Sequence, residues 1–382
     1  MDMASSGIPP SIAASRPRPA AASGERRLRL ALAGLLLYWL SQASAGLAWD
    51  IAWHTFIGRD SFLTPPHVLL YSGVAGAGLT CLAAVLAGTW QHRGRPATAD
   101  RRSTVSLLGL FHAPLGFFVA GCGMLVLLVA APLDNYWHEL YGLDVTLWAP
   151  FHVMGLVGGV IGVLGLVYVL AAEDARTRPV GARGWAPVTV VTLFALSNLL
   201  HGLVVIFQPA EAQSPTIDLG GLQVLTLPVG LAFAVSFVCV SAAVMTRLSG
   251  AAAATAALAA AFATTLALIA PALVREAAAA GGYTFRSPAG PRLQGVDVLL
   301  PAALLLPALV VEALRPLLRS GALIGLACAA PAALIGTAVP LTLARAQPAA
   351  AVALGLALAL PAGALGGWLG DRLGTVWRWH SR

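Results

Sequence analysis

The sequence predicts an all-α protein, a polytopic bundle of about ten transmembrane helices. The chain has 382 residues, of which 58% are hydrophobic and only 10% are charged, and its mean hydropathy is +0.81. This composition lies far outside that of soluble globular domains. Apolar runs of about 20 residues, the length needed to cross a bilayer, recur along the chain. Because these runs are continuous rather than alternating, we expect helices and not a β-barrel.

The first 28 residues are rich in Pro, Ser, Ala and Arg and show no periodicity, which indicates a disordered basic arm. The apolar run that follows has no small-residue cleavage site, so we do not expect a cleaved signal peptide. Ten spans are predicted after the arm, at residues 30–52, 66–90, 104–131, 149–172, 186–208, 222–246, 251–275, 297–315, 321–344 and 349–370.

The basic residues predict an orientation with both termini in the cytoplasm. All 23 of them are arginines, and only five fall in segments assigned to the outer side, namely Arg59, Arg275, Arg286, Arg292 and Arg345. Such a bias follows the positive-inside rule and places the protein in the cell membrane as a multi-pass protein. No arginine cluster with interleaved aromatic residues is present, so we expect no nucleic-acid partner.

A short stretch near the end of the first span holds the first candidate site. Asp50 and His54 are four residues apart, so on a helix they share one face. Pro65 and Pro66 suit the start of the next helix, which places His67 in its first turn. The pattern predicts that three metal-binding side chains meet where one helix ends and the next begins, on the extracytoplasmic side.

The same arrangement recurs after the third span with Asp134, His138 and His152. In each copy a Trp comes directly before the first His, and a Gly and an Asp follow that His by four and six residues. A second Gly lies six residues after the second His. These residues are Trp53, Gly58, Asp60 and Gly73 in the first copy, and Trp137, Gly142, Asp144 and Gly158 in the second. The second copy differs in spacing by one extra residue before His152. This agreement indicates an internal duplication.

One carboxylate and two imidazoles suit a divalent first-row metal, with copper, zinc and iron all compatible. Asp60 and Asp144 are candidates to accept a hydrogen bond from a ligating histidine. His201, in the fifth span, is a candidate to line the metal region, because ionisable residues inside a membrane tend to be functional. Trp53 and Trp137 fit the aromatic belt at the membrane interface. The alternative interpretation is a duplication whose polar residues only hold loops together.

The composition changes near residue 180. Residues 29–180 contain both motifs and are expected to form a duplicated metal-binding domain. Residues 181–382 are rich in Ala and Leu, with few polar side chains in the later spans. Small residues allow close helix packing, so this part is expected to be an accessory domain that acts as a scaffold or as a surface for partners.

The segment from Asp50 to His67 resembles the copper-binding segment of a membrane subunit of the copper membrane monooxygenases, the particulate methane and ammonia monooxygenase family. Both have Asp-x3-His-x12-His with Trp before the first His. The second motif, Asp134-x3-His138-x13-His152, resembles the second copper site of the same family subunit but has Asp in place of Asn. The resemblance covers about residues 35–175. It implies that Asp50, His54 and His67 bind one copper ion, and that Asp134, His138 and His152 bind another.

Several functions remain open at this point. The resemblance implies a copper-dependent oxygenase, or a subunit of one, that acts on a small apolar substrate from the lipid bilayer with other monooxygenase-type subunits as partners. The alternative is a non-enzymatic membrane protein that binds or passes on metal, although the later spans carry no chain of Met, Cys or His for transport. A structural subunit that has lost its metal is a third hypothesis. A homo-oligomer is compatible with each.

Overall fold

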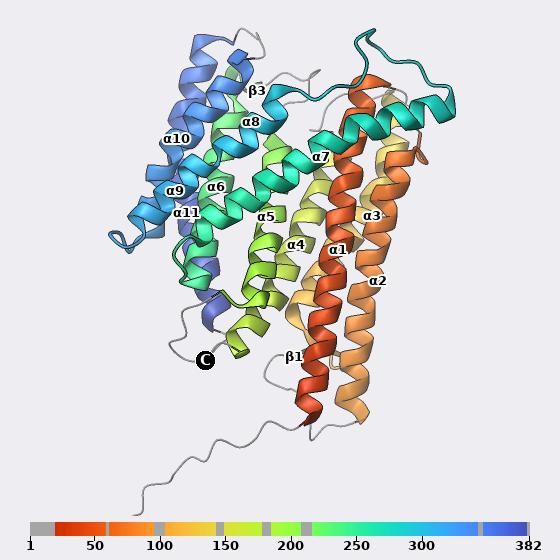
Figure 1. Cartoon of the computed structure of the whole chain (residues 1–382), viewed down its shortest axis with the longest axis vertical. Coiled ribbons are helices and arrows are strands. Elements are labelled where there is room, and N and C mark those ends of the chain that lie inside the picture. The colour runs from red at the N-terminus through yellow and green to blue at the C-terminus, as the bar shows by residue number, and fades with distance from the viewer. Residues whose placement is uncertain are drawn as a thin grey trace, which may run out of the picture.

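The computed structural model describes residues 20–58, 61–94, 104–142, 149–177, 185–207, 216–342 and 347–379. These residues form eleven α-helices and two β-hairpins (Figure 1). The helices are α1 (Ala20–Phe56), α2 (Pro65–Gly94), α3 (Leu115–Tyr141), α4 (Pro150–Thr177), α5 (Pro187–Phe207), α6 (Thr226–Thr246), α7 (Ala251–Gly281), α8 (Gly295–Ala303), α9 (Leu305–Leu314), α10 (Gly321–Thr342) and α11 (Ala349–Trp379).

Ten segments of the described chain are long and apolar enough to cross a membrane, which confirms the all-α, multi-span prediction. Helices α8 and α9 together make the eighth of these, interrupted at Leu304. Pro301 and Pro307 flank this break, and each lacks the N–H that a continuous helix needs. Helix α1 begins at Ala20, so residues 20–28 of the predicted arm are helical. The orientation of the chain in the membrane stays a prediction.

Two short antiparallel hairpins were not predicted. One pairs β1 (Thr104–Leu107) with β2 (Phe111–Pro114), and the other pairs β3 (Thr216–Leu219) with β4 (Leu222–Leu225). Residues 104–114 were therefore wrongly assigned to the third span, which begins at Leu115. The turn residues Leu108 and Gly109 in the first hairpin, and Gly220 and Gly221 in the second, have positive φ. Each hairpin leads directly into a spanning helix.

The duplicated segments fold as two helical hairpins, α1 with α2 and α3 with α4 (Figure 1). The repeated glycine after each second histidine lies where the two helices of its hairpin approach closely. A Cβ atom on Gly73 would lie 2.7 Å from the backbone nitrogen of Ala43 in α1, and one on Gly158 would lie 2.7 Å from the carbonyl oxygen of Gly123 in α3. This part of the sequence repeat therefore reflects helix packing.

The second half of the chain packs around the buried helices α5 and α6. Helix α7 crosses the other helices obliquely and contacts both α1 and α5 (Figure 1). Trp53 of α1 is fully buried against Val274 and Ala278 of α7, and its ring meets that of Tyr283 edge-on at 5.1 Å. The prediction that Trp53 lies in an interfacial belt is therefore wrong, because helix α7 covers this face of α1.

Candidate metal centre

The helix ends fix the positions of the first triad, Asp50, His54 and His67. Asp50 and His54 lie on the last turns of α1, which ends at Phe56. Gly58 follows with φ of 74°, a left-handed conformation that favours glycine and stops the helix. Helix α2 begins at Pro65, and the backbone N–H of His67 points to the side-chain oxygen of Thr64 at 3.4 Å. These features bring His67 back beside Asp50.

The second triad is built in the same way from α3 and α4. Asp134 and His138 lie on the last turns of α3, and His152 lies in the first turn of α4, which begins at Pro150. Gly142 has φ of 84° and its N–H donates to the carbonyl oxygen of His138. The glycine four residues after each first histidine therefore ends the helix about one turn beyond the ligands.

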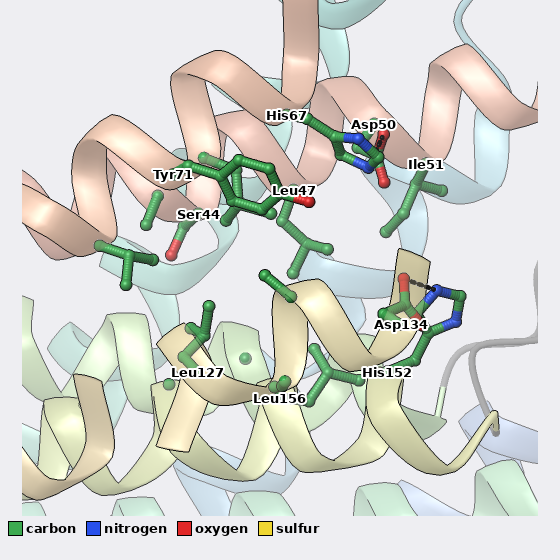
Figure 2. Close-up of a pocket in the computed structure, with 18 of the residues that line it drawn as sticks. Ser44, Leu47, Asp50, Ile51, His67, Tyr71, Leu127, Asp134, His152 and Leu156 are labelled. Atoms are coloured by element: carbon green, nitrogen blue, oxygen red, sulfur yellow. Dashed lines mark ion pairs between the residues drawn. The ribbon is translucent and has the colours of Figure 1, made fainter. Parts of the chain in front are cut away.

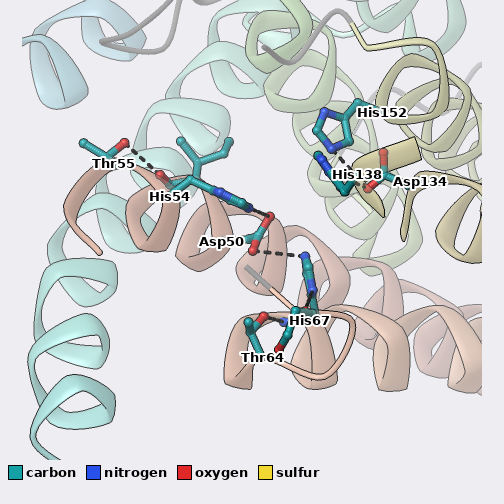
Figure 3. A network of polar contacts seen from close by, with 10 residues as sticks. Asp50, His54, Thr55, Thr64, His67, Asp134, His138 and His152 are labelled. Carbon is teal, nitrogen blue, oxygen red and sulfur yellow. Dashed lines mark hydrogen bonds and ion pairs between the residues drawn. The ribbon is translucent and has the colours of Figure 1, made fainter. Parts of the chain in front are cut away.

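In both triads the carboxylate lies beside the two imidazoles (Figure 3). In the first, Nε2 of His54 is 3.7 Å from Oδ2 of Asp50, and Nε2 of His67 is 3.3 Å from Oδ1. In the second, Nε2 of His138 and Nε2 of His152 are 3.4 and 3.2 Å from Oδ2 of Asp134. One ligand atom from each residue of a triad lies within 4.8 Å of the others.

These distances fit a bound metal ion. Metal–ligand bonds of about 2.0–2.2 Å at tetrahedral angles place neighbouring ligand atoms about 3.4 Å apart. Nδ1 of His67 lies 2.9 Å from the carbonyl oxygen of Ser61, and Nδ1 of His138 lies 3.3 Å from that of Gly142. When Nδ1 carries the proton to these acceptors, the Nε2 lone pair of the neutral ring faces a carboxylate oxygen. The Nε2 lone pair and the carboxylate oxygen repel each other, and a cation between them removes this repulsion. The residues therefore fit a metal.

Both triads border one cavity of about 370 Å³. Asp50, His54 and His67 line it from one side, and Asp134 and His152 line it from the other. Figure 2 shows Asp50 and His67 across the cavity from Asp134 and His152, with apolar side chains between the two pairs. The remaining walls are mostly apolar and include Leu40, Leu47, Val74, Leu127, Leu156 and Val160.

Tyr71 and Arg286 are cavity residues that the sequence did not indicate as part of the site. The ring of Tyr71 stacks on His67 with a centroid distance of 5.3 Å and lines the cavity. Its spacing of four residues from His67 on α2 is the signal that could have revealed it. Arg286, between α7 and α8, also lines the cavity. Its backbone N–H donates to the carbonyl oxygen of Phe56 at 2.8 Å, and its Nη2 donates to that of Gly58 at 3.3 Å.

Arg286 contacts the first triad's loop across 228 positions of sequence, so no local pattern could have indicated it. A Cβ atom on Gly58 would overlap the Arg286 guanidinium, so the glycine leaves the space that this side chain fills. The second half of the chain thus covers the end of the α1–α2 hairpin.

The other candidates from the sequence are Asp60, Asp144 and His201. Asp60 and Asp144 lie outside the described residues. His201 does not line the cavity with the triads, although its neighbours Asn198, Leu199 and Gly202 do. It lines a second cavity on another face of α5.

The chain is therefore a multi-span membrane protein with two Asp/His/His triads that could bind metal. The triads are the two groups of this kind among the residues that the structure describes. Comparison of the chain with models of protein families, with curated proteins and with solved structures returned no match.

Proposed function

We propose that this protein is a membrane copper protein of the monooxygenase type, acting as an oxygenase or as the copper-bearing subunit of one. The observation that carries the proposal is that both triads border a single, largely apolar cavity. A metal-storage or structural site has no need of an apolar chamber beside its ligands. A substrate that dissolves in lipid does need one, because it must reach the metal without crossing water.

The residues of each triad would bind and orient the metal. His54 and His67 would bind it through Nε2, and Asp50 would neutralise part of its charge. The carbonyl oxygen of Ser61 holds the ring of His67 in the required tautomer. With three protein ligands, the metal would keep coordination positions for other molecules. Copper bound there would supply dioxygen binding and one-electron chemistry.

The cavity walls support a small apolar substrate that enters from the bilayer. A cavity of about 150 Å³ lined by Leu, Ile and Phe holds a benzene molecule, so the 370 Å³ here can hold a short hydrocarbon with space beside it. The polar groups of the wall are those of the triads and of Ser44, Thr55, Tyr71, Asn198 and Arg286. The substrate would therefore be oriented by shape and hydrophobic contact.

Filling the cavity without touching a ligand tests this proposal. Gly159 lines the cavity, and a Cβ atom there meets no atom within 4 Å. A Gly159→Leu side chain would thus occupy cavity space without a backbone clash. Gly34 in α1 has the same free surroundings but lines neither cavity, so Gly34→Leu is the matched control.

We expect copper-loaded Gly159→Leu to keep its copper and to lose at least about 90% of the oxidation of short alkanes, alkenes or ammonia, because the leucine excludes the substrate. The wild type and Gly34→Leu should oxidise at least one of these substrates when supplied with a reductant and partner subunits. Gas chromatography measures the oxidation products, and elemental analysis measures the bound copper. Copper retention without oxidation in the wild type would favour the metal-handling alternative, and normal oxidation by Gly159→Leu would contradict the assignment of the cavity.

A further inference from the structure

A second cavity of about 180 Å³ lies between α1, α5, α7 and α8. Most of its wall consists of Ala, Leu, Val and Ile side chains from these helices. It lies along α1 beside the metal cavity, since Ser44, Leu47, Ile51 and Thr55 line both. None of the six triad residues borders it, so it is a separate site.

His201 is the imidazole in the wall of this cavity. Its ring meets Phe262 of α7 edge-on, with a centroid distance of 5.4 Å and an interplanar angle of 87°. Within the described part of the chain, neither ring nitrogen makes a hydrogen bond. His201 is partly exposed and lies on the spanning helix α5, where Val204 and Val205, one turn further on, line the same cavity. A polar ring in an apolar wall gains stability when a ligand or a water bonds to it.

The other polar groups of the wall come from α1 and from the start of α8. Gln294 and Asp297 form a reciprocal capping box, in which the backbone N–H of Gln294 donates to Oδ2 of Asp297 at 3.0 Å. Thr55 and Ser44 donate their hydroxyls to the carbonyl oxygens of Ile51 and Leu40. Arg292 is exposed beside the capping box. His201 is therefore the group in the apolar part of the cavity that can recognise a ligand.

We propose that this second cavity binds a single-ring molecule with one hydroxyl group, of the phenol class, and that His201 forms its hydrogen bond. The volume supports one ring, because a cavity of about 150 Å³ holds benzene. A neutral imidazole both donates and accepts, which suits a hydroxyl. The apolar walls favour an uncharged ligand. The inference does not depend on the proposed copper chemistry.

The test compares the binding of phenol and benzene to the detergent-purified full chain by isothermal titration calorimetry. The measured quantity is the ratio of the two affinities, which cancels differences in protein quality between preparations. Replacement of His201 by leucine removes the hydrogen bond but keeps an apolar side chain of similar size. In His201→Leu we expect the affinity for phenol relative to that for benzene to fall by about tenfold. His201→Gln, which keeps hydrogen-bonding atoms, should shift it less.

Two controls locate the site. Ala263→Leu places extra atoms in the second cavity and should weaken both ligands at least about tenfold. His67→Ala alters the metal cavity alone and should leave both affinities unchanged. An unchanged ratio in His201→Leu would overturn the proposal. So would phenol binding that survives Ala263→Leu and is lost in His67→Ala, because it would place the ligand beside the metal. If His201→Leu does not fold, the phenol and benzene affinities of Ala263→Leu and His201→Gln test whether phenol binds in the second cavity.

Discussion

Replacing His67 with alanine is expected to weaken metal binding at the first triad by at least about 100-fold while the second triad keeps its metal. Replacing even a residue that only hydrogen-bonds to a metal ligand lowers the metal affinity about 10–100-fold. His67 would bind the metal directly. The residue is 8% exposed, and its side chain links α2 to Asp50 of α1. The remaining His54 and Asp50 lie on a single helix, and two ligands hold a metal weakly.

The measurement is a competition titration against a chelator of known affinity, read by elemental analysis after desalting. His152→Ala is the matched variant in the second triad and should produce the reverse pattern. His92→Ala removes an imidazole at the other end of α2, outside both triads, and should change neither site. Equal metal affinity in wild type and His67→Ala would show that the first triad is not a metal site.

Replacing Gly367 with leucine should destabilise the protein by about 1–3 kcal/mol or more, because α10 and α11 cross with their backbones in contact. A Cβ atom on Gly367 would overlap the carbonyl oxygen of Gly321, and one on Gly325 would overlap that of Gly363. Each helix thus supplies two glycines four residues apart, the spacing typical of close packing between membrane helices. Neither backbone can move aside without disturbing α6, which packs against both helices.

Thermal unfolding in detergent measures this effect as a fall in the transition midpoint. Gly34→Leu places the same side chain where a Cβ atom meets nothing within 4 Å, and it should leave the midpoint nearly unchanged. The triads lie on α1 to α4, so the metal content of the folded fraction should be normal in both variants. A normal midpoint in Gly367→Leu would contradict the close crossing of α10 and α11.

The features predicted from the sequence are those that depend on residues near each other in the chain. The apolar runs predict the spans because length and hydrophobicity alone decide membrane insertion. The four-residue spacing of Asp50 and His54 predicts a shared helix face, and Pro65 predicts the start of α2. The structure agrees on all three points, and the two triads form within the two duplicated hairpins.

The remaining features depend on how distant segments pack. Arg286 reaches Gly58 only because α7 crosses α1, and Trp53 is buried for the same reason. The position of His201 depends on which face α5 turns toward α7. Hydrophobic periodicity does not show which face of each helix is buried, since these helices are apolar on most sides. The hairpin at Leu108 and Gly109 was missed because its apolar strands continue directly into the apolar α3.

Copper binding by the two triads is tested most directly by the copper content of the purified chain together with its electron paramagnetic resonance spectrum. The wild type, loaded with copper and desalted, should hold two copper ions per chain, one for each triad. Its spectrum should show a type 2 signal split by nitrogen ligands. The variant with both Asp50→Ala and Asp134→Ala should lose the copper and the signal. Zinc in place of copper, no retained metal, or copper that survives both substitutions would contradict the account.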